Sequence, residues 1–331
     1  MKVCALIPTY NRRAQVFRAI DSVLAQTVPV DEVIVVDDGS TDGTPDAIRS
    51  RYGSQIVLLQ QKNAGVSAAR NLGIRQARCE WIAMLDSDDI WFPRKNERQK
   101  EVLASLGGEF GVCFTDNTFG GNPHMRRSLF QEVGFQSTPG FGPLGDPAEC
   151  ILAGREPFFT SSVLARGSLL HEVGGFDEAL VVREDTDVLF RLGFKTRFCF
   201  TAEPLAEVDR TPTRTDGLCD LFARRDDRVF NSLKGMYTKW LALPEVAGTE
   251  YENRIRNLLR LVCYDSTESK VHERRLGPAL QEVAHLRRIG DSYPSIVATL
   301  LSRKVAKLRR RPVTSVQTDE PKQVGTGLSH L

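Results

Sequence analysis

Long apolar runs are absent from this sequence of 331 residues. No stretch approaches the ~20 consecutive apolar residues that a membrane-spanning helix needs. The first eight residues are too few for a signal peptide, and Pro8 interrupts them. We therefore expect a first strand at the start of the chain and a cytoplasmic protein without membrane spans.

Paired cysteine motifs are also absent. The seven cysteines are odd in number, and no two of them form a Cys-x-x-Cys pair. This argues against a disulfide framework and against a zinc site. We expect all seven to be reduced and to pack as small apolar side chains. They are Cys4, Cys79, Cys113, Cys150, Cys199, Cys219 and Cys263.

The sequence also lacks a large net charge of either sign, because it contains 44 Lys and Arg and 42 Asp and Glu. The positive excess lies in residues 303–331, which hold seven basic and two acidic side chains. We therefore expect no nucleic-acid partner. Residues 293–311 combine apolar and basic side chains at helical spacing. This fits two interpretations: a helix lying on the inner face of an anionic membrane, or a solvated helix face.

The acids that are present cluster after a short apolar run. Trp81–Leu85 has the pattern of a buried strand, and Asp86, Asp88 and Asp89 follow it within four residues. A buried parallel strand ends at the crevice where open α/β sheets bind ligands. A hard cation such as Mg²⁺ or Mn²⁺ would offset the repulsion among the carboxylates and bind substrate phosphates. The pattern predicts a metal–diphosphate site, and the alternative is a polar turn whose acids cap a helix near Pro93.

Apolar runs and helical patterns alternate through the first part of the chain. Each apolar run is short enough for a strand, and the segments between the runs have apolar residues at helical spacing. This alternation predicts a mostly parallel sheet with helices on both faces. The expected strands are 3–7, 32–36, 56–59 and 81–85, and the expected helices are 13–26, 41–52 and 66–77.

Polar residues also follow the first two strands. Thr9 comes after the first, and Asp37 and Asp38 come after the second. Since the carboxyl ends of parallel strands meet at one sheet edge, we expect these side chains near the acids at 86–89. A plain turn, which Asp also favours, is the alternative.

Five blocks of the sequence stand out, at residues 7–12, 22–27, 35–44, 63–73 and 85–89. In this order they resemble the family 2 glycosyltransferases. A sixth block, 173–178 (Val-Gly-Gly-Phe-Asp-Glu), is followed by Glu184 and Asp185. The resemblance covers about residues 3–205. It implies a three-layer α/β/α domain of the Rossmann-like GT-A type, which binds nucleotide-diphospho-sugars, with a C-terminal helical extension.

The resemblance also implies how the chain is divided. Residues 220–310 have apolar side chains at helical spacing, which independently favours packed helices. The Gly- and Pro-rich segment 119–157 is expected to be irregular and to cover the acceptor, or to be a mobile loop without a role. The expected divisions are a transferase domain at 1–210, with a nucleotide-sugar half at 1–115 and an acceptor half at 116–210, a helical extension at 211–311 and a disordered tail at 312–331.

The implied activity is transfer of a sugar from a nucleotide-diphosphate sugar, with UDP as the expected nucleotide, to an acceptor hydroxyl. It would depend on Mg²⁺ or Mn²⁺. The configuration at the anomeric carbon would invert, because one base suffices and no covalent intermediate is needed. The acceptor would be a glycan, a lipid-linked molecule or a small molecule, in cell-surface polysaccharide or glycan biosynthesis.

Two other functions stay open. One is a nucleotidyltransferase on a similar scaffold, although the loop 8–11 lacks the glycines that such an enzyme would need. The other is a non-catalytic sugar-nucleotide-binding protein, although Asp88 and Asp185 are both present.

The resemblance implies roles for individual residues. Asp185, with Glu184 beside it, is the expected base for the acceptor proton, although acids also simply favour a helix N-terminus. Asp88 is expected to bind the metal directly, and Asp86 to share it or to contact the ribose. Arg70 is expected to reach the diphosphate or to form a surface salt bridge. The expected nucleotide-sugar contacts are Pro8, Thr9, Tyr10, Asn11, Asp38, Asn63, Gly65, Arg70, Asp86 and Ser87, of which Asn63 and Gly65 shape a turn.

Overall fold

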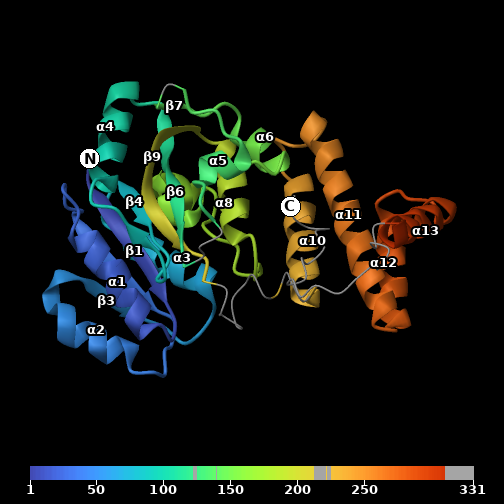
Figure 1. Cartoon of the computed structure of the whole chain (residues 1–331), viewed down its shortest axis with the longest axis horizontal. Coiled ribbons are helices and arrows are strands. Elements are labelled where there is room, and N and C mark those ends of the chain that lie inside the picture. Colours follow the sequence, from blue (N-terminus) through green and yellow to red (C-terminus); the bar gives the residue numbers. More distant parts are fainter. Residues whose placement is uncertain (122–124, 139, 212–220, 222–224, 310–331) are drawn as a thin grey trace, which may run out of the picture. The chain divides into compact units, whose positions relative to one another are not determined.

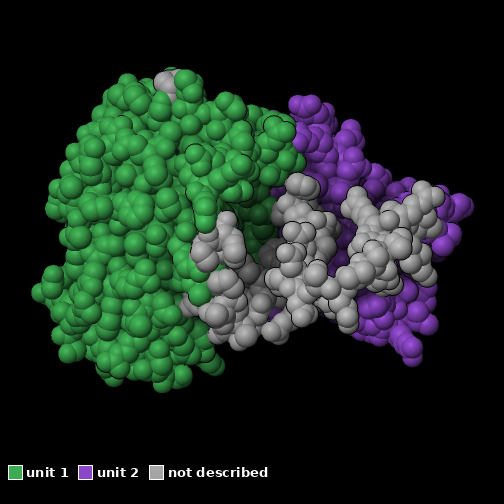
Figure 2. All heavy atoms as spheres, in the orientation of Figure 1, with its two compact units in different colours: residues 1–214 green, residues 215–331 purple. Residues whose placement is uncertain are grey.

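The chain divides into two units, residues 1–214 and residues 215–331 (Figure 2). The computed structural model describes residues 1–121, 125–138, 140–211, 221 and 225–309. Within this part of the chain, no helix is long and apolar enough to cross a membrane.

The first unit is built on one sheet (Figure 1). Its described strands are β1 (Val3–Thr9), β2 (Glu32–Asp37), β3 (Val57–Gln60), β4 (Trp81–Met84), β5 (Ile90–Trp91), β6 (Phe110–Gly120), β7 (Phe141–Pro143), β8 (Leu164–Arg166) and β9 (Arg197–Asp209). They are arranged in the order β3, β2, β1, β4, β8, β6, β9, β5, and β7 pairs with β9 off this path. The first four strands are parallel, as expected. The rest of the sheet is mixed, because β8 is antiparallel to β4 and β6, and β5 and β7 are antiparallel to β9.

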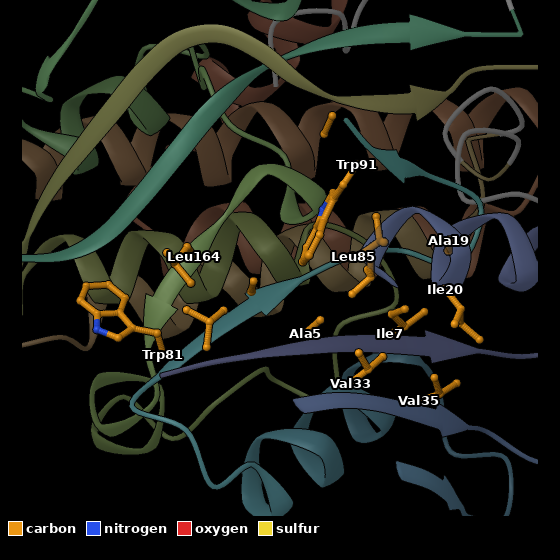
Figure 3. Packing of buried hydrophobic residues seen from close by; sticks show 14 of the residues in the cluster. Ala5, Ile7, Ala19, Ile20, Val33, Val35, Trp81, Leu85, Trp91 and Leu164 are labelled. Carbon is orange, nitrogen blue, oxygen red and sulfur yellow. The ribbon is translucent and has the colours of Figure 1, made fainter. Parts of the chain in front are cut away.

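Helices cover both faces of the parallel strands. The described helices of this unit are α1 (Arg13–Leu24), α2 (Thr44–Tyr52), α3 (Val66–Gln76), α4 (Lys95–Leu106), α5 (Leu129–Val133), α6 (Pro147–Leu152), α7 (Gly167–Glu172) and α8 (Glu184–Gly193). Ala5 and Ile7 of β1 join a buried cluster with Ile20 of α1 (Figure 3). Leu6 points to the other face, where a Cβ on Gly73 of α3 would lie 2.1 Å from its Cδ1. Successive side chains of β1 therefore pack against helices on opposite faces of the sheet. This confirms the predicted three-layer arrangement.

The segment 119–157 is more regular than its glycine and proline content suggested. Its described part contains the end of β6, the helices α5 and α6, and β7. Ser128 begins α5 with a capping box, and Gly134, in the left-handed region, ends it. Asp146 caps α6, with Pro147 at its first position. Glycine and proline here mark the ends of helices, so the expectation of an irregular segment is wrong for these residues.

The second unit is helical in its described part. Its helices are α10 (Asp227–Leu241), α11 (Glu250–His272), α12 (Leu276–Arg288) and α13 (Tyr293–Arg309). The apolar stripe of α10 is buried, and it comprises Val229, Phe230, Leu233, Met236, Tyr237 and Trp240. These helices confirm the predicted helical extension. The tail expected at 312–331 lies outside the described residues.

Two cysteines form a disulfide, so the expectation that all seven are reduced is wrong for this pair. Cys4 lies in β1, and Cys79 lies 75 positions later, just before β4, with the two Cα atoms 5.5 Å apart. The parallel pairing of Val3 with Trp81 brings these segments together. Spacing along the sequence could not reveal the bond, because the proximity arises from the sheet. The free cysteines among the described residues are Cys113, Cys150, Cys199 and Cys263, and Cys219 lies outside them.

We predict that reduction of the Cys4–Cys79 disulfide lowers the free energy of unfolding by about 4.5 kcal/mol, the chain-entropy value for a closed loop of this length. Guanidinium chloride unfolding of the oxidised chain, the reduced chain and Cys79→Ser measures the difference. Cys150→Ser, at a half-buried free cysteine, is the matched control and should still respond to reduction. Identical unfolding midpoints for the oxidised and reduced chains would contradict this prediction.

Candidate functional site

Polar residues at the ends of β1, β2 and β4 lie at one edge of the sheet. Thr9 is the register partner of Asp37 in the β1–β2 ladder. The Asp38 N–H donates to the carbonyl of Thr9 at 2.9 Å. The Leu85 N–H donates to the carbonyl of Leu6 at 3.0 Å. The end of β4 therefore lies beside β1 at the same edge. The three polar segments that follow these strands are therefore neighbours.

A buried arginine joins two groups of acids at this edge. Arg70 of α3 is 2% exposed. Its Nη2 donates to Asp86 Oδ1 at 2.6 Å, and its Nη1 donates to Glu184 Oε1 at 2.8 Å. Burial lowers the pKa of Arg70, but the two carboxylates outweigh burial and raise it above its ordinary value. The alternative of a surface salt bridge is therefore wrong, and contact with a diphosphate stays a prediction.

Asp89 is the most buried of the three acids that follow β4. Its Oδ1 accepts a hydrogen bond from the Asp209 N–H at 2.9 Å, and its Oδ2 accepts one from the Ser161 hydroxyl. Burial raises the pKa of Asp89 well above its ordinary value, and the charges of Asp86 and Asp88 raise it further. Asp89 thus ties the end of β4 to β9, and the alternative that it caps α4 is wrong.

Asp86 and Asp88 are the carboxylates of this cluster that fit a divalent cation. Their side chains are 34% and 18% exposed, and Asp88 forms an ion pair with Arg12. Carboxylate oxygens are the ligands that Mg²⁺ and Mn²⁺ prefer. Within the described residues, three side-chain ligands do not converge at these acids. A cation here would therefore need oxygen ligands from phosphate or water in addition to the two carboxylates.

Glu184 and Asp185 open α8 and differ in their surroundings. Glu184 is buried and contacts Arg70. Burial raises the pKa of Glu184 above its ordinary value. The charge of Arg70 opposes this rise, and the charge of Asp185 adds to it. Asp185 is half-buried. Its Oδ1 accepts from the Thr186 N–H at 2.7 Å, and its Oδ2 accepts from the Thr160 hydroxyl at 3.3 Å. Asp185 is the more accessible carboxylate of the pair and the better placed to receive a proton.

Two residues without a predicted role hold the Gly-Gly-Phe-Asp turn beside α8. Asn71 of α3 donates to the carbonyl of Phe176 and accepts from its N–H, both at 2.8 Å. Arg191 of α8 donates to the carbonyl of Gly175 at 2.8 Å. A Cβ on Gly175, whose φ is +70°, would lie 2.5 Å from Asn71 Oδ1. Asn71 falls inside a block that carried the family resemblance, so a signal for it existed, whereas nothing in the sequence pointed to Arg191.

The expected nucleotide contacts lie around Asp38, which is buried. Its Oδ1 accepts from Gln61 Nε2 at 2.7 Å and from the Ala64 N–H at 2.9 Å. Its Oδ2 accepts from the Gly65 N–H at 2.8 Å. The carboxylate therefore holds the turn that contains Asn63 and Gly65, and contact between Asp38 and a nucleotide base stays a prediction.

Two buried oxygen atoms at these strand ends lack a hydrogen-bond partner within the described residues. They are Thr9 Oγ1 and Asp37 Oδ1. Because buried polar atoms in proteins nearly always have a partner, a ligand or water is expected to supply one here. The other expected contacts at this edge are Tyr10 and Asn11, which are exposed, and Pro8 and Ser87, which are buried.

The sequence of residues 4–154 matches the model of the family described as glycosyl transferase family 2. This part of the chain belongs to that family. The match favours a glycosyltransferase over a nucleotidyltransferase and over a non-catalytic binding protein. It ends before Glu184 and Asp185, so the roles of these two acids rest on geometry and on the sequence resemblance.

Relatives of this glycosyltransferase domain occur in polysaccharide synthesis. The succinoglycan biosynthesis protein ExoO of Rhizobium meliloti is 32% identical over 186 residues, which are 55% of this chain and 53% of that protein. The chain spans about a third of the length of the first curated relatives it matches, which are glycosyltransferases of Rickettsia species.

Solved structures share the fold of this chain. TarS of S. aureus in complex with UDP-GlcNAc is 16% identical with a TM-score of 0.57, over 88% of this chain and 93% of that one. The mannosyltransferase PcManGT of Pyrobaculum calidifontis, in complex with GDP-Man and Mn²⁺, is 19% identical with a TM-score of 0.54, over 94% of this chain and 81% of that one. The fold is therefore the predicted GT-A fold.

Proposed function

We propose that this chain transfers a sugar from a nucleotide-diphosphate sugar, with UDP as the expected nucleotide, to an acceptor hydroxyl, with inversion at the anomeric carbon and with Mg²⁺ or Mn²⁺. The bridge Asp86–Arg70–Glu184 carries the proposal. It joins the acids expected at the diphosphate to the acids expected at the acceptor. The GT-A structures solved with UDP-GlcNAc and with GDP-Man and Mn²⁺ support a nucleotide-sugar donor and a metal.

The charge of the site supports a cation. Five carboxyl groups gather at the bridge: the two that bind Arg70 and three on residues beside them. They are those of Asp86, Asp88, Asp89, Glu184 and Asp185. The guanidinium groups of Arg12 and Arg70 offset only part of this charge, and a diphosphate would add more. A cation held by Asp86 and Asp88 would neutralise the charge that develops on the leaving diphosphate.

Asp185 would remove the proton from the acceptor hydroxyl as its oxygen attacks the anomeric carbon. The nucleoside diphosphate would leave in the same step, so one base suffices and the configuration inverts. The hydrogen bonds from Thr160 and Thr186 restrict the direction of the Asp185 carboxylate. Glu184 accepts a hydrogen bond from Arg70. It would hold Arg70 in place rather than accept the proton of the acceptor.

The division of labour along the chain follows from this assignment. Residues 1–115 would bind the donor and residues 116–210 the acceptor, with 211–311 as an extension of the domain. The relative named for succinoglycan biosynthesis supports a glycan acceptor in polysaccharide synthesis, and a lipid-linked or small acceptor would use the same base.

A cytoplasmic location at the inner face of a membrane would suit a lipid-linked acceptor. Helix α13 exposes Tyr293, Val297 and Leu301, which are four residues apart and therefore lie along one side of the helix. Contact of residues 293–311 with the membrane surface stays a prediction, which co-sedimentation of the full chain with anionic vesicles tests.

We predict that UDP binds tightly only with Mg²⁺ or Mn²⁺ and that Asp88→Ala removes this dependence. The variant should also lower kcat by roughly 10²-fold, because a metal supplies several kcal/mol of charge stabilisation. Calorimetric titration of UDP with Mn²⁺ and with EDTA measures the dependence. Asp46→Ala, at an exposed acid of α2 paired with Arg49, is the matched control and should behave as the unchanged chain. Equal UDP affinity with Mn²⁺ and with EDTA would rule out this site.

We predict that Asp185→Asn lowers kcat by roughly 10²-fold or more, the usual contribution of a positioned base. Donor affinity should stay nearly unchanged, because the loss lies in the transition state. Glu184→Gln should mainly lower stability, because Arg70 then has one carboxylate beside it instead of two. Steady-state kinetics and the anomeric configuration of the product, read by NMR, test both statements. Normal turnover by Asp185→Asn would refute the base assignment, and a retained configuration would refute the single displacement.

A further inference from the structure

The first turn of α8, which presents Asp185, starts from an unfavourable backbone conformation. Arg183, the residue before the helix, has a φ of 63°. This left-handed conformation is uncommon for residues other than glycine. The side chain of Arg183 forms no capping hydrogen bond to the helix. Such a conformation persists when the surrounding structure holds it, so contacts from outside α8 must fix this turn.

Glu156, in the loop that follows α6, supplies these contacts. Its Oε1 accepts a hydrogen bond from Arg183 Nη2 at 2.8 Å, and its Oε2 accepts one from the Thr186 hydroxyl at 2.9 Å. The Glu156 side chain is 15% exposed. Arg183 and Thr186 are the residues immediately before and after the Glu184–Asp185 pair. One largely buried carboxylate therefore holds both sides of this pair.

The same short segment also contacts Asp185 directly. Thr160, four positions after Glu156, donates to Asp185 Oδ2 at 3.3 Å. Burial raises the pKa of Glu156, Arg183 opposes the rise, and Asp185 adds to it. Both carboxyl groups also bind Thr186, whose hydroxyl donates to Glu156 Oε2 and whose N–H donates to Asp185 Oδ1. Residues 156–160 thus contact both Asp185 itself and the residues beside the Glu184–Asp185 pair.

We propose that Glu156 is a positioning residue that directs the Asp185 carboxylate toward the acceptor hydroxyl by holding Arg183 and Thr186. The proposal rests on the proposed function, in which Asp185 is the base. Both oxygens of Glu156 are bonded inside the protein, so it acts through Asp185 rather than on the substrate. A misdirected base weakens transition-state binding while ground-state binding of the donor is unchanged.

Glu156→Gln tests the proposal because it keeps the size of the side chain but leaves one oxygen acceptor where there were two. We expect kcat to fall roughly 10-fold, since small misplacements of reacting groups cost rates of this order. Donor affinity should stay close to that of the unchanged chain, and the melting temperature should fall only slightly, because the amide oxygen still accepts one hydrogen bond. In an Asp185→Asn background the same substitution should cause no further fall in kcat, because no base is left to direct.

Glu172→Gln is the matched control. Glu172 lies at the end of α7, its side chain is 54% exposed, and it faces Lys195 at 3.7 Å. The control makes the same chemical change at a surface ion pair, and it should leave kcat and the melting temperature unchanged.

Two results would overturn the proposal: an unchanged kcat in Glu156→Gln, or an equal fall in kcat in the Asp185→Asn background. If Glu156→Gln does not fold, Thr186→Val removes one of the two bonds and carries the same test, with a smaller expected fall. Normal turnover by Asp185→Asn would instead refute the base assignment itself. The failure of the proposed function is therefore distinguishable from the failure of this inference.

Discussion

A guanidinium held between two carboxylates in the interior is the interaction on which the site depends. Taking the charge of Arg70 out of water is costly, and only close, well-aligned partners offset that cost. Asp86 at the end of β4 and Glu184 at the start of α8 supply those partners. The sheet edge and α8 cannot separate without leaving a buried charge unpaired. The bridge therefore fixes the spacing between Asp86, which we propose lies at the diphosphate, and the start of α8, which carries the proposed base.

Neighbouring acids gain different roles from their surroundings. Asp89 and Glu184 are buried, and burial raises their pKa values. Both are bonded to other elements of the first unit, so they hold structure. Asp88 and Asp185, one position away from each of them, are more exposed. These two are the acids that we propose bind a cation and accept a proton. The contrast arises because adjacent side chains point in different directions, both after β4 and in the first turn of α8.

Much of the fold was predictable because it follows from local pattern. The alternation of apolar runs and helical segments located the parallel strands, and acids after strands located the site edge. The mixed half of the sheet was not predictable, because a run as short as Leu164–Arg166 gives the same signal in either direction. The disulfide, the burial of Arg70 and the role of Glu156 depend on contacts between residues far apart in the sequence. No spacing rule carries that information.

The free energy of unfolding of Asp86→Asn, Glu184→Gln and the double variant tests the central claim most directly. Either single change leaves Arg70 one carboxylate partner, whereas the double change leaves its buried charge with no carboxylate beside it, which is far more costly. The double variant should therefore lose more stability than the sum of the single losses, by about 1 kcal/mol or more. In an Arg70→Met background the excess should vanish. Additive losses in the presence of Arg70 would contradict the account.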